Sequence, residues 1–152
     1  MARYLRSATI GTNDPKTSTL LIGASQTIVE GDILAIDATS KLGIVAVAAS
    51  AALFAIAGAS ITTTASPTAA DKIPVTLLKD AVVRIPFTAA GTKKTFASTD
   101  KYITKFDLAD KNSVAPDDTT GGMCHILDYD NTALTCDVVF DDALLIIPFF
   151  VN

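Results

Sequence analysis

Short apolar runs separated by turn residues dominate the hydrophobic pattern of this chain. Runs of this kind occupy residues 27–29, 33–36, 43–48, 53–57, 72–78, 81–87, 102–106, 123–127 and 133–140. Gly, Asp, Asn and Ser separate most of them, and no segment sustains the 3.6-residue period of an amphipathic helix. Strands that recur roughly every ten residues are typical of sandwiches and small barrels. The pattern therefore predicts an all-β (mainly β) domain, built as a small β-barrel or a sandwich.

The uncharged segment at residues 42–59 has three possible structures. A membrane-spanning helix needs roughly 20 mostly apolar residues, so the length nearly qualifies. An Ala-rich helix is the second possibility, because Ala is the best helix former. The large side chains of Val45 and Val47 alternate with alanines, however, and a period of two is typical of a strand. We therefore expect two strands here and no membrane segment.

The clearest hairpin joins residues 123–127 to residues 133–140. If the turn is centred near Asp130, Cys124 lies opposite Cys136, at a separation that a disulfide could bridge after a small adjustment. The alternative is two reduced cysteines. We favour it, because a chain with two cysteines and no secretory signal is expected to fold in a reducing cytoplasm.

The two ends of the chain differ from the body. Residues 1–24 hold three basic residues and one acidic residue, and we expect them to form an extended N-terminal arm. Residues 25–152 are expected to form a single β domain. The apolar segment at residues 143–151 has two readings: a final strand on the chain's own core, or a surface that a neighbouring subunit buries.

Composition narrows the classes of function. The chain has 152 residues, of which 49% are hydrophobic and 18% charged, so intrinsic disorder is excluded. Its net charge is -4. An acidic chain gains nothing from counterion release on a phosphate backbone, so we expect no nucleic-acid partner.

Catalytic groups are scarce. His125 is the single histidine, and its neighbour Cys124 must point to the opposite face of a regular strand, so the two cannot form a nucleophile–base pair. Two cysteines and one histidine also lack the paired spacing of a zinc site. Residues 128–132 match a calcium loop poorly, because the central Gly and the distal Glu are missing. We predict no catalytic residue, no metal and no cofactor.

Four segments together resemble the capsid decoration proteins of tailed bacteriophages, also called cement or head-stabilisation proteins. They are Val29–Ile36 with its Gly-Asp-hydrophobic pattern, Val45–Gly58 with its Ala-rich strands ending at a Gly, Ala81–Phe87, and Thr120–Phe140. The resemblance implies a compact β-barrel or β-tulip body without enzymatic activity. It also implies synthesis in the host cytoplasm and docking on the virion surface between subunits of the major capsid protein. Members are usually homo-oligomers, so a trimer is favoured, with a dimer or monomer possible.

The ends of the chain lie outside this resemblance and supply the candidate interface residues. These are Arg3, Arg6, Leu20, Leu21, Ile22, Phe149 and Phe150. The arm could add a strand to a capsid sheet through main-chain hydrogen bonds, so deleting residues 2–20 is expected to leave the fold intact and abolish binding. The alternatives are another virion component, such as a head fibre base or tail protein, and a non-catalytic β-barrel that binds a small ligand.

Overall fold

The computed structural model describes residues 1–8, 14–48 and 50–146 and folds them into antiparallel β-sheets. Sheet I has the strand order β1 (Arg3–Ser7), β9 (Ala81–Pro86), β14 (Thr135–Phe140), β13 (Cys124–Asp130) and β10 (Lys105–Phe106). Sheet II has the order β2 (Thr17–Leu21), β8 (Lys72–Leu77), β6 (Leu53–Ala57), β4 (Ile33–Ile36) and β5 (Gly43–Val45). There are also two two-stranded sheets. One pairs β3 (Thr27–Ile28) with β7 (Ile61–Thr62), and the other pairs β11 (Leu108–Asp110) with β12 (Ser113–Val114). Two short 3₁₀ turns are η1 (Ser98–Asp100) and η2 (Asp142–Leu144).

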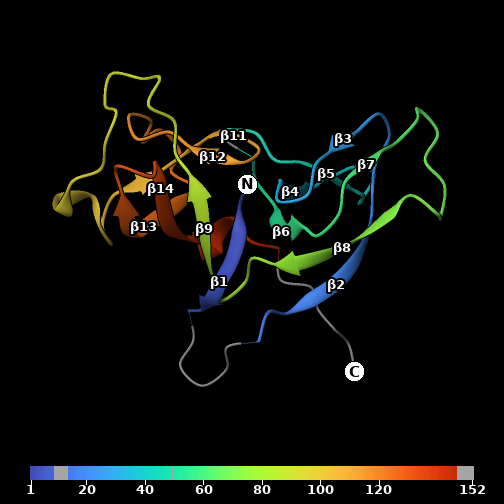
Figure 1. The fold of residues 1–152 in the computed structure, drawn as a ribbon. Helices are drawn as coiled ribbons and strands as arrows, with labels where there is room; N and C mark the ends of the chain where they lie inside the picture. The colour runs from blue at the N-terminus through green and yellow to red at the C-terminus, as the bar shows by residue number, and fades with distance from the viewer. Residues whose placement is uncertain (9–13, 49, 147–152) are drawn as a thin grey trace.

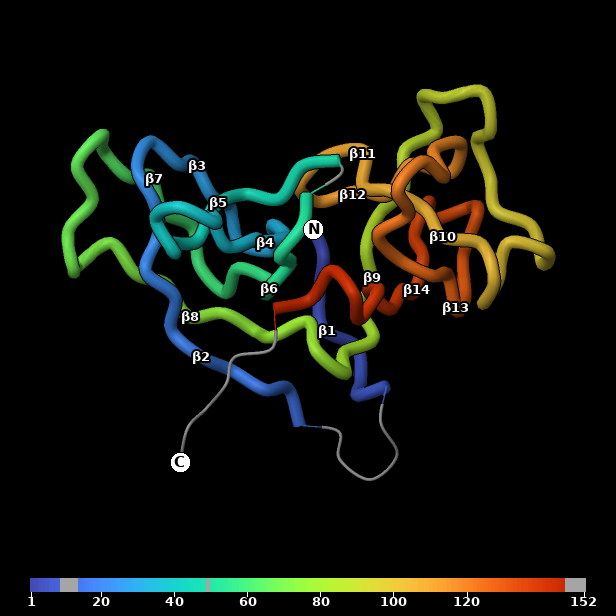
Figure 2. Tube along the Cα trace, turned by 180° about the vertical axis from the view of Figure 1, so that it is seen from behind, coloured from blue at the N-terminus to red at the C-terminus, as the bar shows by residue number. Residues whose placement is uncertain are grey.

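The two large sheets lie beside each other, with β1 near the middle of the molecule (Figures 1 and 2). Residues 78–80 connect β8 of sheet II directly to β9 of sheet I. Each sheet keeps two ends, so neither closes on itself. The all-β prediction is confirmed, and the architecture is a pair of open sheets rather than a closed barrel.

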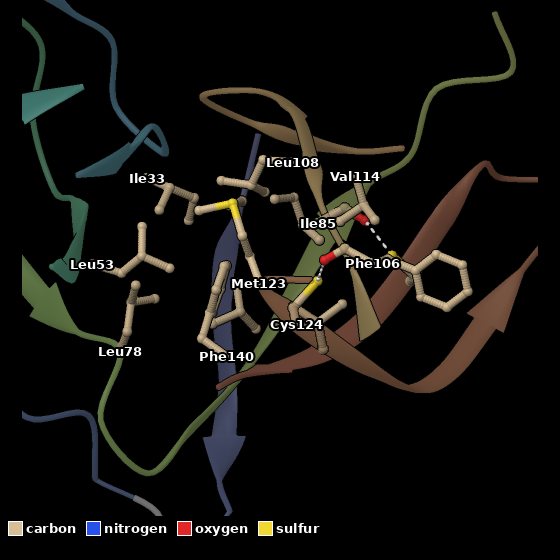
Figure 3. Close-up of a cluster of buried hydrophobic side chains, with 14 of the residues drawn as sticks. Ile33, Leu53, Leu78, Ile85, Phe106, Leu108, Val114, Met123, Cys124 and Phe140 are labelled. Atoms are coloured by element: carbon tan, nitrogen blue, oxygen red, sulfur yellow. Dashed lines mark hydrogen bonds between the residues drawn. The ribbon is translucent and has the colours of Figure 1, made fainter. Parts of the chain in front are cut away.

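One hydrophobic core joins the two sheets. Ile33 and Leu53 from sheet II and Met123 and Phe140 from the sheet I side belong to the same buried cluster. Figure 3 shows Met123 and Phe140 between the sheet II side chains and those of Ile85 and its neighbours. A second cluster belongs to sheet II alone. It comprises Ile22, Ile28, Leu34, Ala55, Ala57, Ile73, Val75 and Leu77. The central strands of sheet II, β4 and β6, are therefore buried on both faces, whereas β2 and β8 each keep an exposed face.

A buried carboxylate ties sheet II to the β11–β12 pair. Asp32 accepts a hydrogen bond from Val29 N at 2.8 Å, and its side chain is 1% exposed. Lys111 lies 2.8 Å from the same carboxylate and also donates to the carbonyl of Thr27 at 3.1 Å. Gly31, just before it, adopts φ +88°, a conformation that glycine tolerates best. The Gly-Asp pair of the sequence thus forms a turn whose acid is held by a lysine from a distant hairpin.

The Ala-rich segment forms strands, as predicted. It contributes β5 and β6, and the expected strands at residues 33–36 and 53–57 coincide with β4 and β6. No helix in the part of the chain that the structure describes is long and apolar enough to cross a membrane.

The N-terminal segment differs from the expected arm. Its described residues form β1, which pairs with β9, and β2, which pairs with β8. Ala2 is buried and belongs to the shared core, so this segment is part of the folded body. Deletion of residues 2–20 would strip one strand from each large sheet, so we now expect it to destabilise the fold rather than leave it intact.

The cysteines are reduced and do not face each other. Cys124 pairs across the hairpin with Phe140, and Cys136 pairs with Tyr129. The strands extend further than expected, so the turn occupies residues 131–134 and its centre shifts toward the C-terminus. Both thiols are buried, and each lies against a main-chain carbonyl. The predicted pairing is wrong, and the favoured alternative of two free cysteines is confirmed.

Candidate interaction surface

The long connection between β9 and β10 is fixed to the body by Phe96. This side chain is buried, and its ring meets those of Phe87 and Phe106 edge to face, with centroids 4.8 and 5.1 Å apart. Edge-to-face pairs are a favoured arrangement of aromatic rings. Asn131 in the β13–β14 turn accepts a hydrogen bond from Phe96 N at 3.0 Å and donates to Phe96 O at 2.9 Å. The amide thus pairs with the loop backbone much as a neighbouring strand would.

Ion pairs fix the next part of the loop. Lys93 lies 2.6 Å from the buried carboxylate of Asp100, which also accepts a hydrogen bond from Ala97 N. Lys101 donates to Asp128 on β13 at 2.7 Å and lies 5.2 Å from the centre of the Tyr129 ring. This hydrogen bond raises the pKa of Lys101 and lowers that of Asp128, so both stay charged around neutral pH.

Tyr102 and Ile103 follow directly and point into solvent; we call this pair the apolar projection. Tyr102 is 65% exposed and Ile103 is 85% exposed, the two highest values among the large hydrophobic side chains of the described residues. Tyr102 adopts φ +68°, which is rare for a bulky residue. Its main-chain N donates to Ile126 O at 2.9 Å, so the backbone is held in this conformation by sheet I.

The loop that carries the apolar projection lies at the end of the molecule farthest from sheet II, where it is drawn in yellow (Figures 1 and 2). It is therefore accessible from outside without any rearrangement of the core. A strained backbone that exposes two large apolar side chains on a rigid support is the kind of feature that binding surfaces contain.

An open groove lies across the outer face of sheet I. Its volume is about 640 Å³, and its lining includes Arg3, Arg84, Asp128, Asp130 and Asp137. Within it, the guanidinium of Arg84 donates to both carboxylate oxygens of Asp137, at 2.6 and 2.8 Å. This pairing raises the pKa of Arg84. Asp128 is shared between this groove and the base of the apolar projection, so the polar and apolar surfaces adjoin.

The two cysteines and the histidine lie on β13 and β14. Burial raises the pKa of both cysteine thiols, so neither is a thiolate at neutral pH. Cys124 is buried and His125 is only partly buried, as expected for neighbouring side chains on opposite faces of β13. In the described structure, Nδ1 of His125 has no hydrogen-bond partner. Within residues 1–8, 14–48 and 50–146, no three His, Cys, Asp or Glu side chains form a group that could hold a metal ion.

The candidate interface residues named from the sequence do not form one surface. Arg3 lines the groove, and Arg6 is exposed further along β1. Leu21 is 36% exposed on β2, whereas Leu20 packs against the second core cluster. Ile22 is fully buried in that cluster, so its assignment to an interface is wrong. Phe149 and Phe150 lie outside the described residues.

The sequence pattern does not indicate the apolar projection, because residues 102–106 are typical of a strand. Only Lys105 and Phe106 are in β10, and the preceding residues belong to the loop. A usable signal was present in Asp100 and Lys101: two charged residues directly before an aromatic and a β-branched residue fit a solvent-exposed segment better than a buried strand.

Comparison with protein-family models gives no match, and neither a curated protein nor a solved structure matches this chain.

Proposed function

We propose that this chain is a non-enzymatic structural protein that decorates and stabilises the outer surface of a tailed-bacteriophage capsid. Its partner is the major capsid protein, and the apolar projection is the principal contact. The observation that carries the proposal is the exposure of Tyr102 and Ile103 on a strained but fixed backbone. Soluble proteins seldom present such side chains so openly unless a partner covers them.

The surroundings of the apolar projection suit a protein–protein contact. Interfaces commonly combine an aromatic or aliphatic anchor with a polar rim. Here the anchor is Tyr102 with Ile103, and the adjoining groove supplies arginine and aspartate side chains to the rim. Because the loop is held by Phe96, Asn131 and two ion pairs, little conformational entropy is lost on docking. Repetition of the same contact over a capsid lattice would give high overall avidity from modest single contacts.

The test is binding to capsid shells assembled from the major capsid protein that is encoded with this chain. Purified wild-type protein and the Ile103→Ser variant are each mixed with undecorated shells, and bound protein is measured after sedimentation of the shells. We expect Ile103→Ser to weaken binding at least about tenfold, since central apolar anchors dominate interface energies. The thermal unfolding curve should not change, because Ile103 is 85% exposed.

Leu134→Ser is the matched control. Leu134 is also an exposed hydrophobic residue at positive φ, but it lies in the β13–β14 turn. It should bind like the wild type. Equal binding by wild type and Ile103→Ser would remove the apolar projection from the contact, and failure of the wild-type protein to bind any shell would overturn the function itself.

A further inference from the structure

The ends of the two large sheets are protected unequally. Exposed sheet edges invite pairing with other chains, so proteins guard them with charges, bulges, short strands or covering segments. In sheet I, β1 carries Arg3, Arg6 and a register shift between Tyr4 and Arg6. The other end, β10, is two residues long and includes Lys105.

In sheet II, the β5 end is covered. Ile22 bridges to Gly43, and Gly23 N donates to Gly43 O at 2.8 Å. The side chain of Gln26 accepts a hydrogen bond from Val45 N at 3.1 Å. These contacts close most of the edge of the strand.

Among residues 1–8, 14–48 and 50–146, nothing gives the β2 end any of these protections. Residues Thr17–Leu21 include no charge and no proline, and they pair with β8 without a register shift. Lys16 O and Ile22 N both bond toward the β8 side, so the main-chain groups of Ser18 and Leu20 also face β8. Those of Thr17, Thr19 and Leu21 face outward, and within the described chain none has a hydrogen-bond partner.

This outward pattern is complementary to itself. In an antiparallel pair, residues that exchange hydrogen bonds lie directly opposite each other and alternate with residues that do not. When two copies of β2 meet with Thr19 opposite Thr19, Thr17 of each copy lies opposite Leu21 of the other. Every outward N–H and C=O of the three residues then finds a partner, and no like charges face each other along the seam.

We propose that two copies of this chain pair through β2, antiparallel and centred on Thr19, so that their second sheets join across a two-fold axis. This pairing is independent of the proposed docking on a capsid, since it uses sheet II and leaves the apolar projection at the far end of sheet I. A seam of one short strand is small, so the free dimer is weak and gains from any surface that holds many copies close together.

The experiment is sedimentation equilibrium of the purified full chain at concentrations up to about 1 mM, where weak association is still measurable. The wild type is expected to show a monomer–dimer equilibrium. Thr19→Lys places two like charges face to face at the two-fold axis and should weaken association at least about tenfold. Thr62→Lys, the same change at an exposed strand position on β7, is the matched control and should dimerise like the wild type.

Register is tested with single cysteine variants. Cα atoms of directly opposed residues in a hydrogen-bonded pair are about 5.5 Å apart, within disulfide range. Mild oxidation should therefore link Thr19→Cys into a covalent dimer but leave Thr62→Cys monomeric, because both native cysteines are buried.

Three results would overturn the proposal. The first is a wild-type protein that stays monomeric throughout the concentration range. The second is a dimer that Thr19→Lys does not weaken. The third is loss of the dimer when residues 147–152 are removed. That result would mean that the C-terminal segment, and not β2 of the second copy, pairs with the outer edge of β2. Folding of each variant is checked by circular dichroism, and the outward direction of the Thr19 N–H leaves the pairing with β8 intact.

Discussion

The two large sheets have equal numbers of strands but differ in what covers their second face. The central strands of sheet II are enclosed on both sides: Ile33 lies in the shared core, and Leu34 beside it lies in the second cluster. Sheet I packs one face on the shared core and leaves Arg84 and Asp137 on the other face, in the open groove. The two sheets therefore differ in what they expose: sheet I has a solvent-facing side and also carries the apolar projection.

The composition explains this division. Small alanines such as Ala55 and Ala57 let the strands of sheet II pack on both faces without excess volume. Sheet I instead packs aromatic side chains, and the contact between Phe96 and Phe106 fixes the long β9–β10 connection to the core. A strand buried on both faces cannot present side chains to a partner except at its edge. The central strands β4 and β6 are buried in this way, and β2 at the end of the sheet keeps an open edge among the described residues.

The largest expected effect comes from breaking the core that the sheets share. Leu53→Ala removes a fully buried side chain, and we expect it to lower the free energy of unfolding by about 3 kcal/mol. Urea unfolding followed by circular dichroism gives the stability, and amide hydrogen exchange shows which strands lose protection. Both sheets should lose it together, whereas loss confined to sheet II would show that the sheets are independent units. Val47→Ala is the control; at 57% exposure it should change stability by less than about 0.5 kcal/mol.

The next effect concerns the link between sheet II and the β11–β12 pair. Lys111→Met leaves the carboxylate of Asp32 buried without its cation and should cost about 2 kcal/mol, because an unpaired buried charge is poorly tolerated. Chemical denaturation of the variant measures this loss. The double variant Asp32→Asn/Lys111→Met should recover part of it, since the isolated charge is then gone. A double variant as unstable as the sum of the two single variants would contradict a direct coupling.

A smaller effect of opposite sign is expected beside sheet I. Asp107 is buried, and its Oδ1 has no hydrogen-bond partner. Burial, with Asp118 nearby, raises its pKa in the folded state. The folded protein therefore disfavours the charged form, and this destabilisation is present at pH 7 and fades as the pH falls through the raised pKa. Asp107→Asn should stabilise the protein by about 1 kcal/mol at pH 7.

The same variant should have almost no advantage below about pH 3, where the wild-type carboxyl is largely protonated in both the folded and the unfolded state. Thermal unfolding of wild type and variant across this pH range is the measurement. An advantage that stays constant with pH would show that the carboxylate charge is not the cause.

Much of the fold follows from local pattern. The strands at residues 33–36 and 53–57 are predictable because turn residues bound them closely and their side chains are apolar. The register of the β13–β14 hairpin cannot be predicted in this way. Asp128 and Asp130 are typical turn residues, but in the structure they continue β13 on its solvent-facing side. The packing of β1 and β2 onto the sheets also escapes the sequence, since polar strands such as Thr17–Leu21 are defined by the neighbour that they pair with.

The candidate surface was less predictable than the fold. The exposure of Tyr102 depends on a backbone conformation fixed by long-range contacts to Ile126 and Asp128, and these contacts have no local signature. Arg3 was identified by its charge alone, and the groove around it forms only when β1 pairs with β9 and brings Arg3 opposite Arg84. We therefore propose a loop and a sheet face as the interface, in place of the ends of the chain.

The most direct test of the central claim is a cryo-electron microscopy map of capsid shells decorated with the wild-type chain. We expect Tyr102 and Ile103 to lie buried against the major capsid protein, with the loop in the conformation it has here and sheet II directed away from that contact. A map in which the apolar projection faces solvent while another surface contacts the shell would contradict it.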